Sequence, residues 1–218
     1  AIKSFQAREG VQVNTVFNGC GILTAQMKTI TNKKLTGFPD TYMACDKYYL
    51  EIVDGLFQDA VEISDTEVVI AVPKGNPKQI KSLADLARPG VRVAVGQPDQ
   101  CTIGVLTRQV LEAEKVYEKV MANVVTQTAT SALLIAPVST GAADASLAYL
   151  TDTRAEAEKV DAVRITSAAA KAIQPMGIAK TSRNKHLARR LIRAITQARS
   201  DFEAAGFHWR FDADGSGS

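Results

Sequence analysis

The stretch 91–111, VRVAVGQPDQCTIGVLTRQVL, constrains the fold more than any other part of the chain. Its first residues include valines at alternate positions, a pattern typical of a strand. Gly96 and Pro98 then predict a tight turn, and from Ile103 onward the apolar residues follow helical spacing. A strand, a turn and a helix in this order predict an open α/β sheet. In such sheets, ligands bind beyond the carboxyl ends of the strands.

Strand-like and helix-like segments alternate over almost the whole chain. We expect helices at 1–10, 22–33, 47–57, 82–88, 103–120, 131–138 and 180–199, and strands at 11–16, 40–46, 68–72, 91–95, 124–128, 143–149, 162–165 and 176–179. This alternation predicts an α/β protein with mostly parallel sheets. Because an α/β protein seldom begins with a helix, we also expect a further strand before Ala1. The last residues, DADGSGS at 212–218, are typical of a flexible end.

Composition excludes several classes of partner. The 218 residues include 26 Lys and Arg against 23 Asp and Glu, and a net charge of +3 is too balanced to indicate nucleic-acid binding. The basic run 180–199 has an apolar face, so we interpret it as an amphipathic helix with a solvated basic side. No apolar run approaches the length of a membrane span, so we expect no direct membrane insertion.

Three loops share one plan, in which a strand ends and a helix begins. They are 18–21, 45–46 and 96–102. The first amides of a helix lack partners within the helix, and they suit an anion. Asp46 is the expected cap of the helix that follows it. The 96–102 loop has neither a Walker A pattern nor G-x-G-x-x-G, so it is not a standard nucleotide cradle, and we expect no cofactor.

The cysteines Cys20, Cys45 and Cys101 each fall in one of these loops, so we expect them to lie near one another. Their spacing contains no C-x-x-C and no zinc-finger pattern, and an odd number excludes complete pairing within one chain. Three alternatives remain open. The three thiols form a site for a soft metal such as Cu(I) or Zn, they form one disulfide and leave one thiol, or they stay free and fill small buried spaces.

An ordered set of short motifs resembles a known family. The set is Gly19-Cys20-Gly21, Met43-Ala44-Cys45-Asp46, VIAVPKGNP at 69–77, SLADL at 82–86, VGQP at 95–98 with Ile103-Gly104, and GAADA at 141–145. In this order, over 1–210, the chain is similar to the molybdate-type periplasmic solute-binding proteins of ABC importers. The resemblance implies the two-lobe type II periplasmic-binding fold with a ligand cleft between the lobes, and it implies that the family's first strand is absent. The run PKGNP at 73–77 interrupts regular secondary structure, and we take it as the boundary between the lobes. We expect lobe 1 at 1–72 and 172–218 and lobe 2 at 73–171.

The resemblance also implies a set of ligand-binding residues. By this resemblance, the serine of the family's first ligand-binding loop corresponds to Cys20, flanked by Gly19 and Gly21. An amide-donating turn corresponds to Ile103, beside Cys101 and Thr102. A second helix-start amide corresponds to Ser131, and the ligand-binding tyrosine corresponds to Tyr149. The change from serine to Cys20 bears on the ligand, because a thiol is a weaker hydrogen-bond donor than a hydroxyl.

The function implied by the resemblance is capture of a small oxyanion, molybdate or tungstate in type, for the membrane subunits of an ABC importer. Such a protein is a monomer without catalysis, in the periplasm or outside the cell, and membrane anchoring through a segment before Ala1 is an open alternative. Two other functions stay open: the ligand-sensing domain of a regulator, and a cysteine-lined metal or thiol site in the same cleft. Enzyme chemistry is disfavoured, because the chain has only His186 and His208 and no G-x-S-x-G or H-E-x-x-H pattern.

Overall fold

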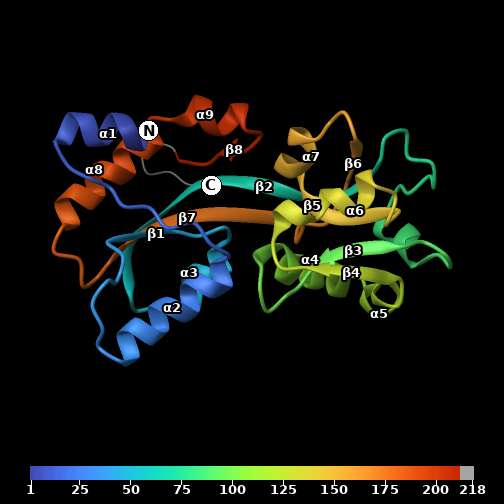
Figure 1. Ribbon diagram of the computed structural model, residues 1–218, viewed down its shortest axis with the longest axis horizontal. Helices are drawn as coiled ribbons and strands as arrows, with labels where there is room; N and C mark the ends of the chain where they lie inside the picture. The colour runs from blue at the N-terminus through green and yellow to red at the C-terminus, as the bar shows by residue number, and fades with distance from the viewer. Residues whose placement is uncertain (212–218) are drawn as a thin grey trace. The chain divides into compact units, whose positions relative to one another are not determined.

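The computed structural model describes residues 1–211 and forms two compact units (Figure 1). Unit 1 comprises Ala1–Asp65 with Ile173–Ser218, and unit 2 comprises Thr66–Ala172. Two strands, β2 (Phe57–Pro73) and β7 (Lys171–Ala179), pass from one unit to the other. The sequence boundary at 72/73 therefore lies inside unit 2. The reason is that the run 68–72 is fully buried and paired with strands of unit 2 on both of its edges.

Unit 1 contains α1 (Ile2–Glu9), α2 (Cys20–Asn32), β1 (Thr41–Met43), α3 (Lys47–Glu51), α8 (Lys185–Thr196), α9 (Arg199–Ala204) and β8 (His208–Trp209), with the adjoining parts of β2 and β7. Strand β1 is antiparallel to β7, and β8 is antiparallel to β2. Helix α1 packs against α8 (Figure 1), and Phe5 from α1 is buried with Ile178 of β7 and Leu191 of α8. The apolar face of the basic helix thus forms part of the core of unit 1.

Unit 2 contains η1 (Leu83–Ala87), β3 (Val93–Gly96), α4 (Thr102–Ala113), α5 (Tyr117–Met121), β4 (Val124–Thr128), η2 (Ser131–Leu133), α6 (Ile135–Ser139), β5 (Ala145–Tyr149), α7 (Leu150–Ala155) and β6 (Val160–Arg164). Strand β3 lies between β4 and β5 and is parallel to both. Helix α4 packs on β3 (Figure 1), and Ile103, Leu106 and Val110 enter the core of this unit. Because the three strands are parallel, their carboxyl ends share one edge of the sheet.

The predicted α/β class is confirmed, but the sheets are mixed rather than mostly parallel. Strand β2 is antiparallel to β5 and to β6, and β1 is antiparallel to β7. A parallel pair requires a crossover connection between its strands, and α4 with α5 provides one between β3 and β4. Strand β2 instead enters unit 2 from unit 1 and pairs with β5 and β6 in the opposite direction. The alternation of elements along the sequence did not reveal this connection.

Most predicted elements are present, and the largest errors are local. The predicted strand at 11–16 is irregular, with Val16 and Phe17 largely exposed and the Val13 amide donating to Gln6 Oε1 at 2.6 Å. Strand β2 begins at Phe57, well before the predicted start, and the long helix predicted at 180–199 begins only at Lys185. The predicted flexible end at 212–218 lies outside the described residues. Within 1–211, no helix is both long and apolar enough to cross a membrane.

Candidate functional site

The loop between β3 and α4 is folded tightly against the start of the helix. The Gln97 amide donates to the Thr128 carbonyl at 2.8 Å, which ties this loop to the end of β4. The Cys101 amide donates in turn to the Gln97 carbonyl at 3.0 Å. A Cβ atom on Gly104 would lie 2.5 Å from the Gln97 carbonyl carbon, so only glycine fits at this position. The sequence thus fixes the direction in which the first turn of α4 points.

The first turn of α4 presents hydrogen-bond donors. Within the described part of the chain, the amides of Thr102 and Ile103 donate to no protein acceptor, as expected of a helix start. The Thr102 hydroxyl is also buried without a protein partner among these residues. Buried polar groups are nearly always hydrogen-bonded to something. A small anion at this helix start is a natural acceptor for these donors.

The ends of β4 and β5 lie at the same edge of unit 2. Ser131 begins η2, three residues after the end of β4. Burial raises the pKa of Asp152 in α7, and the Ser131 side chain offsets part of the effect. Tyr149 is half-buried, is the last residue of β5 and packs against the core of unit 2. Five of the predicted ligand residues therefore share this edge: Cys101, Thr102, Ile103, Ser131 and Tyr149. Their role in ligand binding stays a prediction.

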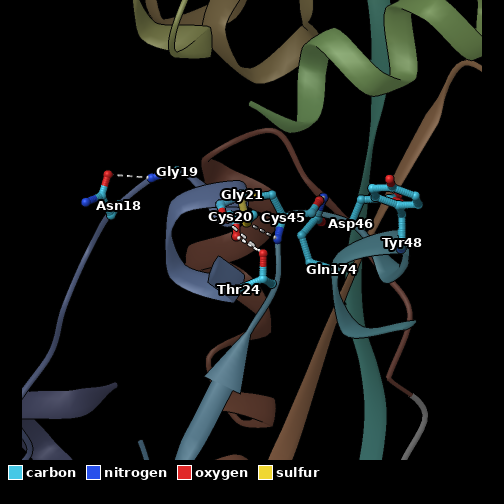
Figure 2. Close-up of a disulfide and its surroundings, with 9 residues drawn as sticks. All are labelled: Asn18, Gly19, Cys20, Gly21, Thr24, Cys45, Asp46, Tyr48 and Gln174. Carbon is cyan, nitrogen blue, oxygen red and sulfur yellow. Dashed lines mark hydrogen bonds between the residues drawn. A yellow bond between two sulfur atoms is a disulfide. The ribbon is translucent and has the colours of Figure 1, made fainter. Parts of the chain in front are cut away.

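The other predicted loop lies in unit 1 at the start of α2. Gly19 is the N-cap of this helix, and Cys20 is its first residue. Cys20 is buried and forms a disulfide with Cys45, which follows β1 (Figure 2). The Cys20 side chain therefore has no S–H to donate, contrary to the weak thiol donor expected from the sequence. Within residues 1–211, the amides of Cys20 and Gly21 in this first turn donate to no protein acceptor, so they are the donors available to a ligand.

The cysteines fulfil one of the predicted alternatives, because two form a disulfide and one thiol remains. Cys101 is the free cysteine; it is buried, and its Sγ lies 3.6 Å from the Thr128 carbonyl. Burial raises the pKa of the Cys101 thiol. A sulfur in a disulfide is not a thiolate ligand, so the three-cysteine metal cluster has lost two of its ligands. Among residues 1–211, no group of three His, Cys, Asp or Glu side chains could hold a metal ion.

Asp46 is the helix cap that the sequence predicts. Its carboxylate accepts hydrogen bonds from the amides of Tyr48 and Ile173, each at 3.0 Å (Figure 2 shows Asp46 and Tyr48). Burial raises the pKa of Asp46, and the two amides act in the opposite direction. Gln174 completes this region, because it donates to the Cys45 carbonyl at 3.2 Å and accepts from the Ser64 hydroxyl at 2.9 Å. No sequence motif marked Gln174 or Ser64, since each lies within a long strand.

Comparison with known proteins places this chain in a class of solute-binding proteins. The family model for bacterial extracellular solute-binding proteins matches residues 1–208, and the chain belongs to this family. Among its relatives, the molybdate-binding protein ModA of Mycobacterium tuberculosis is 30% identical over 201 residues. This match covers 91% of the present chain and 74% of the relative.

Solved structures show the same fold. The periplasmic molybdate-binding protein of Azotobacter vinelandii matches with a TM-score of 0.71 and 20% identity, over 94% of this chain and 91% of that one. The sulfate-binding protein SubI of Mycobacterium tuberculosis matches with a TM-score of 0.72 and 18% identity, over 94% and 80%. The chain thus has the type II periplasmic-binding fold that its motifs predict. Members of its family are periplasmic or extracellular and deliver small solutes to the membrane subunits of ABC transporters.

Proposed function

We propose that this chain captures a small tetrahedral oxyanion of the molybdate type and delivers it to an ABC importer. The observation that carries the proposal is the first turn of α4. There, the amides of Thr102 and Ile103 and the buried Thr102 hydroxyl have no acceptor within the described residues. An oxyanion accepts several hydrogen bonds at once, and bonds to a charged acceptor are stronger than neutral ones. The named ligands of the relatives, molybdate and sulfate, have this chemistry.

The proposed site holds the anion without a neutralising cation. Neither 18–21 nor 97–103 contains Lys or Arg, so the donors are neutral. Such donors recover the cost of desolvating the anion through directional hydrogen bonds and still permit its release. We assign Gly19, Cys20 and Gly21 of unit 1 and Cys101, Thr102, Ile103, Ser131 and Tyr149 of unit 2 as the residues that bind the oxyanion. Cys20 contributes its amide only.

The disulfide is consistent with the proposed location. Disulfides persist in oxidising compartments, such as the periplasm and the cell exterior, and are rare in the cytosol. Cys20–Cys45 therefore supports the assignment to the periplasm or the extracellular space. We propose a monomeric binding protein that uses no cofactor and catalyses no reaction, with the membrane subunits of the importer as its protein partners. Its charge balance favours no nucleic-acid partner.

Native mass spectrometry tests the proposal. The protein is equilibrated with molybdate, tungstate, sulfate or phosphate and sprayed under non-denaturing conditions. The account predicts a saturable adduct of one oxyanion per chain, with molybdate and tungstate surviving competition from sulfate and phosphate. A preference for sulfate or phosphate would change the assigned anion but keep the class of solute. The absence of an adduct with all four anions would reject oxyanion binding.

A further inference from the structure

The Cys20–Cys45 disulfide joins the first turn of α2 to the segment between β1 and α3 (Figure 2). The Cys45 amide also donates to Cys20 Sγ at 3.1 Å. The first turn of α2 supplies the amides that the proposed function assigns to unit 1. The covalent bond therefore lies within the candidate site itself rather than at a distance from it.

Few other contacts hold this first turn in place. Of the residues of α2, only Cys20, Thr24 and Met27 are buried, and the Thr24 hydroxyl bonds to carbonyls of its own helix. The chain before the helix is irregular, and Phe17 in it is 87% exposed. The Gly19 amide is held only locally, by Asn18 Oδ1 at 2.8 Å (Figure 2). The position of the first turn thus depends strongly on the disulfide.

The other side of the disulfide is firmly held. The Ala44 amide donates to the Pro175 carbonyl at 2.9 Å, and the Cys45 carbonyl accepts from Gln174. Asp46, the next residue, is buried and accepts two backbone amides. The disulfide therefore fastens a weakly held helix start to a well-anchored segment. Cys45 is exposed, whereas Cys20 is only 2% exposed, so a reductant reaches the bond from the Cys45 side.

We propose that this disulfide controls oxyanion binding by redox state, with the oxidised form as the tight binder; the inference rests on the proposed function. The reductant is a dithiol. One of its thiolates attacks Cys45 Sγ and forms a mixed disulfide, and the electron pair of the broken bond leaves on Cys20 Sγ, which takes up a proton. The second thiolate of the reductant then attacks the reductant sulfur of this mixed disulfide. Cys45 leaves as a thiolate and takes up a proton. Two electrons pass to the protein, and the dithiol leaves as a cyclic disulfide.

Thermodynamic linkage gives this proposal a second, independent signature. If the oxyanion binds the oxidised form more tightly by some factor, bound oxyanion must make the disulfide harder to reduce by the same factor. A disulfide that stabilises the fold without changing the affinity of the folded protein produces neither effect. The two measurements therefore check each other, because both must give the same factor.

The first experiment is calorimetric titration with tungstate, which is less readily reduced than molybdate. One sample is fully oxidised; the other is reduced with dithiothreitol and desalted without oxygen. We expect the reduced form to bind on the order of tenfold more weakly. The double variant Cys20→Ala/Cys45→Ala is the control, and it should bind weakly before and after the same treatment. Equal affinity of the two wild-type forms overturns the inference and leaves the proposed function intact, whereas no binding by either form overturns the proposed function.

The second experiment needs no variant. The fraction of reduced Cys20 and Cys45 is measured by thiol alkylation and mass mapping in a buffer of reduced and oxidised dithiothreitol, with and without saturating tungstate. Tungstate should shift the midpoint toward stronger reducing conditions by the factor found in the titration. An unchanged midpoint, for an oxyanion shown to bind the oxidised protein, contradicts redox control.

Discussion

The backbone of Gly104 lies directly against the carbonyl of Gln97, so that a Cβ atom added to Gly104 would be only 2.6 Å from Pro98 N and 2.7 Å from Gln97 O. Both obstacles are backbone atoms, which cannot rotate away as a flexible side chain can. The close approach sets where the loop between β3 and α4 meets the helix. It therefore sets the position of the amides proposed to bind the oxyanion.

Gly104→Ala should displace this loop. We expect affinity for molybdate to fall at least tenfold, and the free energy of unfolding to fall by about 1–3 kcal/mol, the usual cost of overpacking. Calorimetric titration and chemical denaturation measure the two effects. Gly90→Ala is the control, because Gly90 has φ +77° and open space around it, so alanine there costs backbone strain without a collision. If Gly90→Ala loses as much affinity as Gly104→Ala, the effect comes from stability and not from loop position.

Thr102→Val tests the buried hydroxyl at the start of α4. Valine keeps the shape of the side chain but removes its hydrogen-bond donor. Affinity for molybdate should fall about tenfold or more, because a hydrogen bond to a charged partner contributes about 1.5–3 kcal/mol. Stability should change little, since the hydroxyl has no protein partner within the described chain.

Thr107→Val is the matched control for this substitution. Thr107 lies in the same helix, is equally buried and also lacks a protein partner for its hydroxyl among residues 1–211. It is farther along α4, beyond the first turn, so its loss should leave affinity unchanged. Equal effects of the two substitutions on oxyanion binding would remove Thr102 from the site.

The pair Arg92 and Asp144 predicts an acid-sensitive contribution to stability. The Asp144 carboxylate accepts from the Arg92 amide at 2.9 Å and from its guanidinium at 2.9 Å. The guanidinium hydrogen bond holds the pKa of Asp144 below its ordinary value. Because folding lowers this pKa, the ionised Asp144 carboxylate stabilises the folded state at pH values above its unfolded pKa of about 3.9. This stabilisation is lost as pH falls through the lower pKa of the folded state.

Asp144→Asn should therefore lower the free energy of unfolding by about 1 kcal/mol at pH 7, a figure kept small because the Arg92 side chain is 47% exposed. The difference between wild type and variant should shrink below about pH 4. Denaturation at a series of pH values measures it. Glu112→Gln, which removes an exposed ion pair with Arg108, is the comparison and should cost almost nothing at any pH. A pH-independent difference for Asp144→Asn would show that charge is not the cause.

Two double variants separate the roles of the Cys20 position. Cys20→Ala/Cys45→Ala removes the disulfide and leaves no side-chain donor, whereas Cys20→Ser/Cys45→Ala removes it and adds a hydroxyl. Because a hydroxyl is a good donor to an oxyanion, the serine variant should bind molybdate several-fold more tightly than the alanine variant. Titration at matched thermal stability measures the difference. Equal affinities would mean that the Cys20 side chain does not face the ligand.

The sequence predicted the local elements well where strand and helix patterns are strong. The alternating valines at 91–95 and the helical spacing after Thr102 led directly to β3 and α4. Asp46 was predicted as a cap, and a capping box of Ser82 with Asp85 begins the helix predicted at 82–88. These features depend on neighbouring residues along the chain, so local chemistry suffices to predict them.

The errors concern what lies far apart along the chain. The valines at 11–16 alternate as in a strand, yet no strand in 1–211 pairs with them. The long strand β2 carries the polar residues Gln58, Asp59 and Glu62, which concealed its first half. The disulfide partner of Cys20 also depended on tertiary structure, because Cys45 and Cys101 lie in similar loops and were equivalent candidates. Strand pairing and cysteine pairing are non-local, so a single sequence could not decide them.

The measurement that tests oxyanion capture most directly is calorimetric titration of the oxidised protein and of Tyr149→Phe with molybdate, tungstate, sulfate and phosphate, with both melting temperatures recorded. The account predicts one-to-one binding of molybdate and tungstate by the wild-type protein. For the variant, which loses one O–H donor, it predicts affinity about tenfold to a hundredfold lower. No heat of binding from any of the four anions to a folded wild-type protein would contradict oxyanion capture, and equal affinities of the two proteins would exclude Tyr149 from the site.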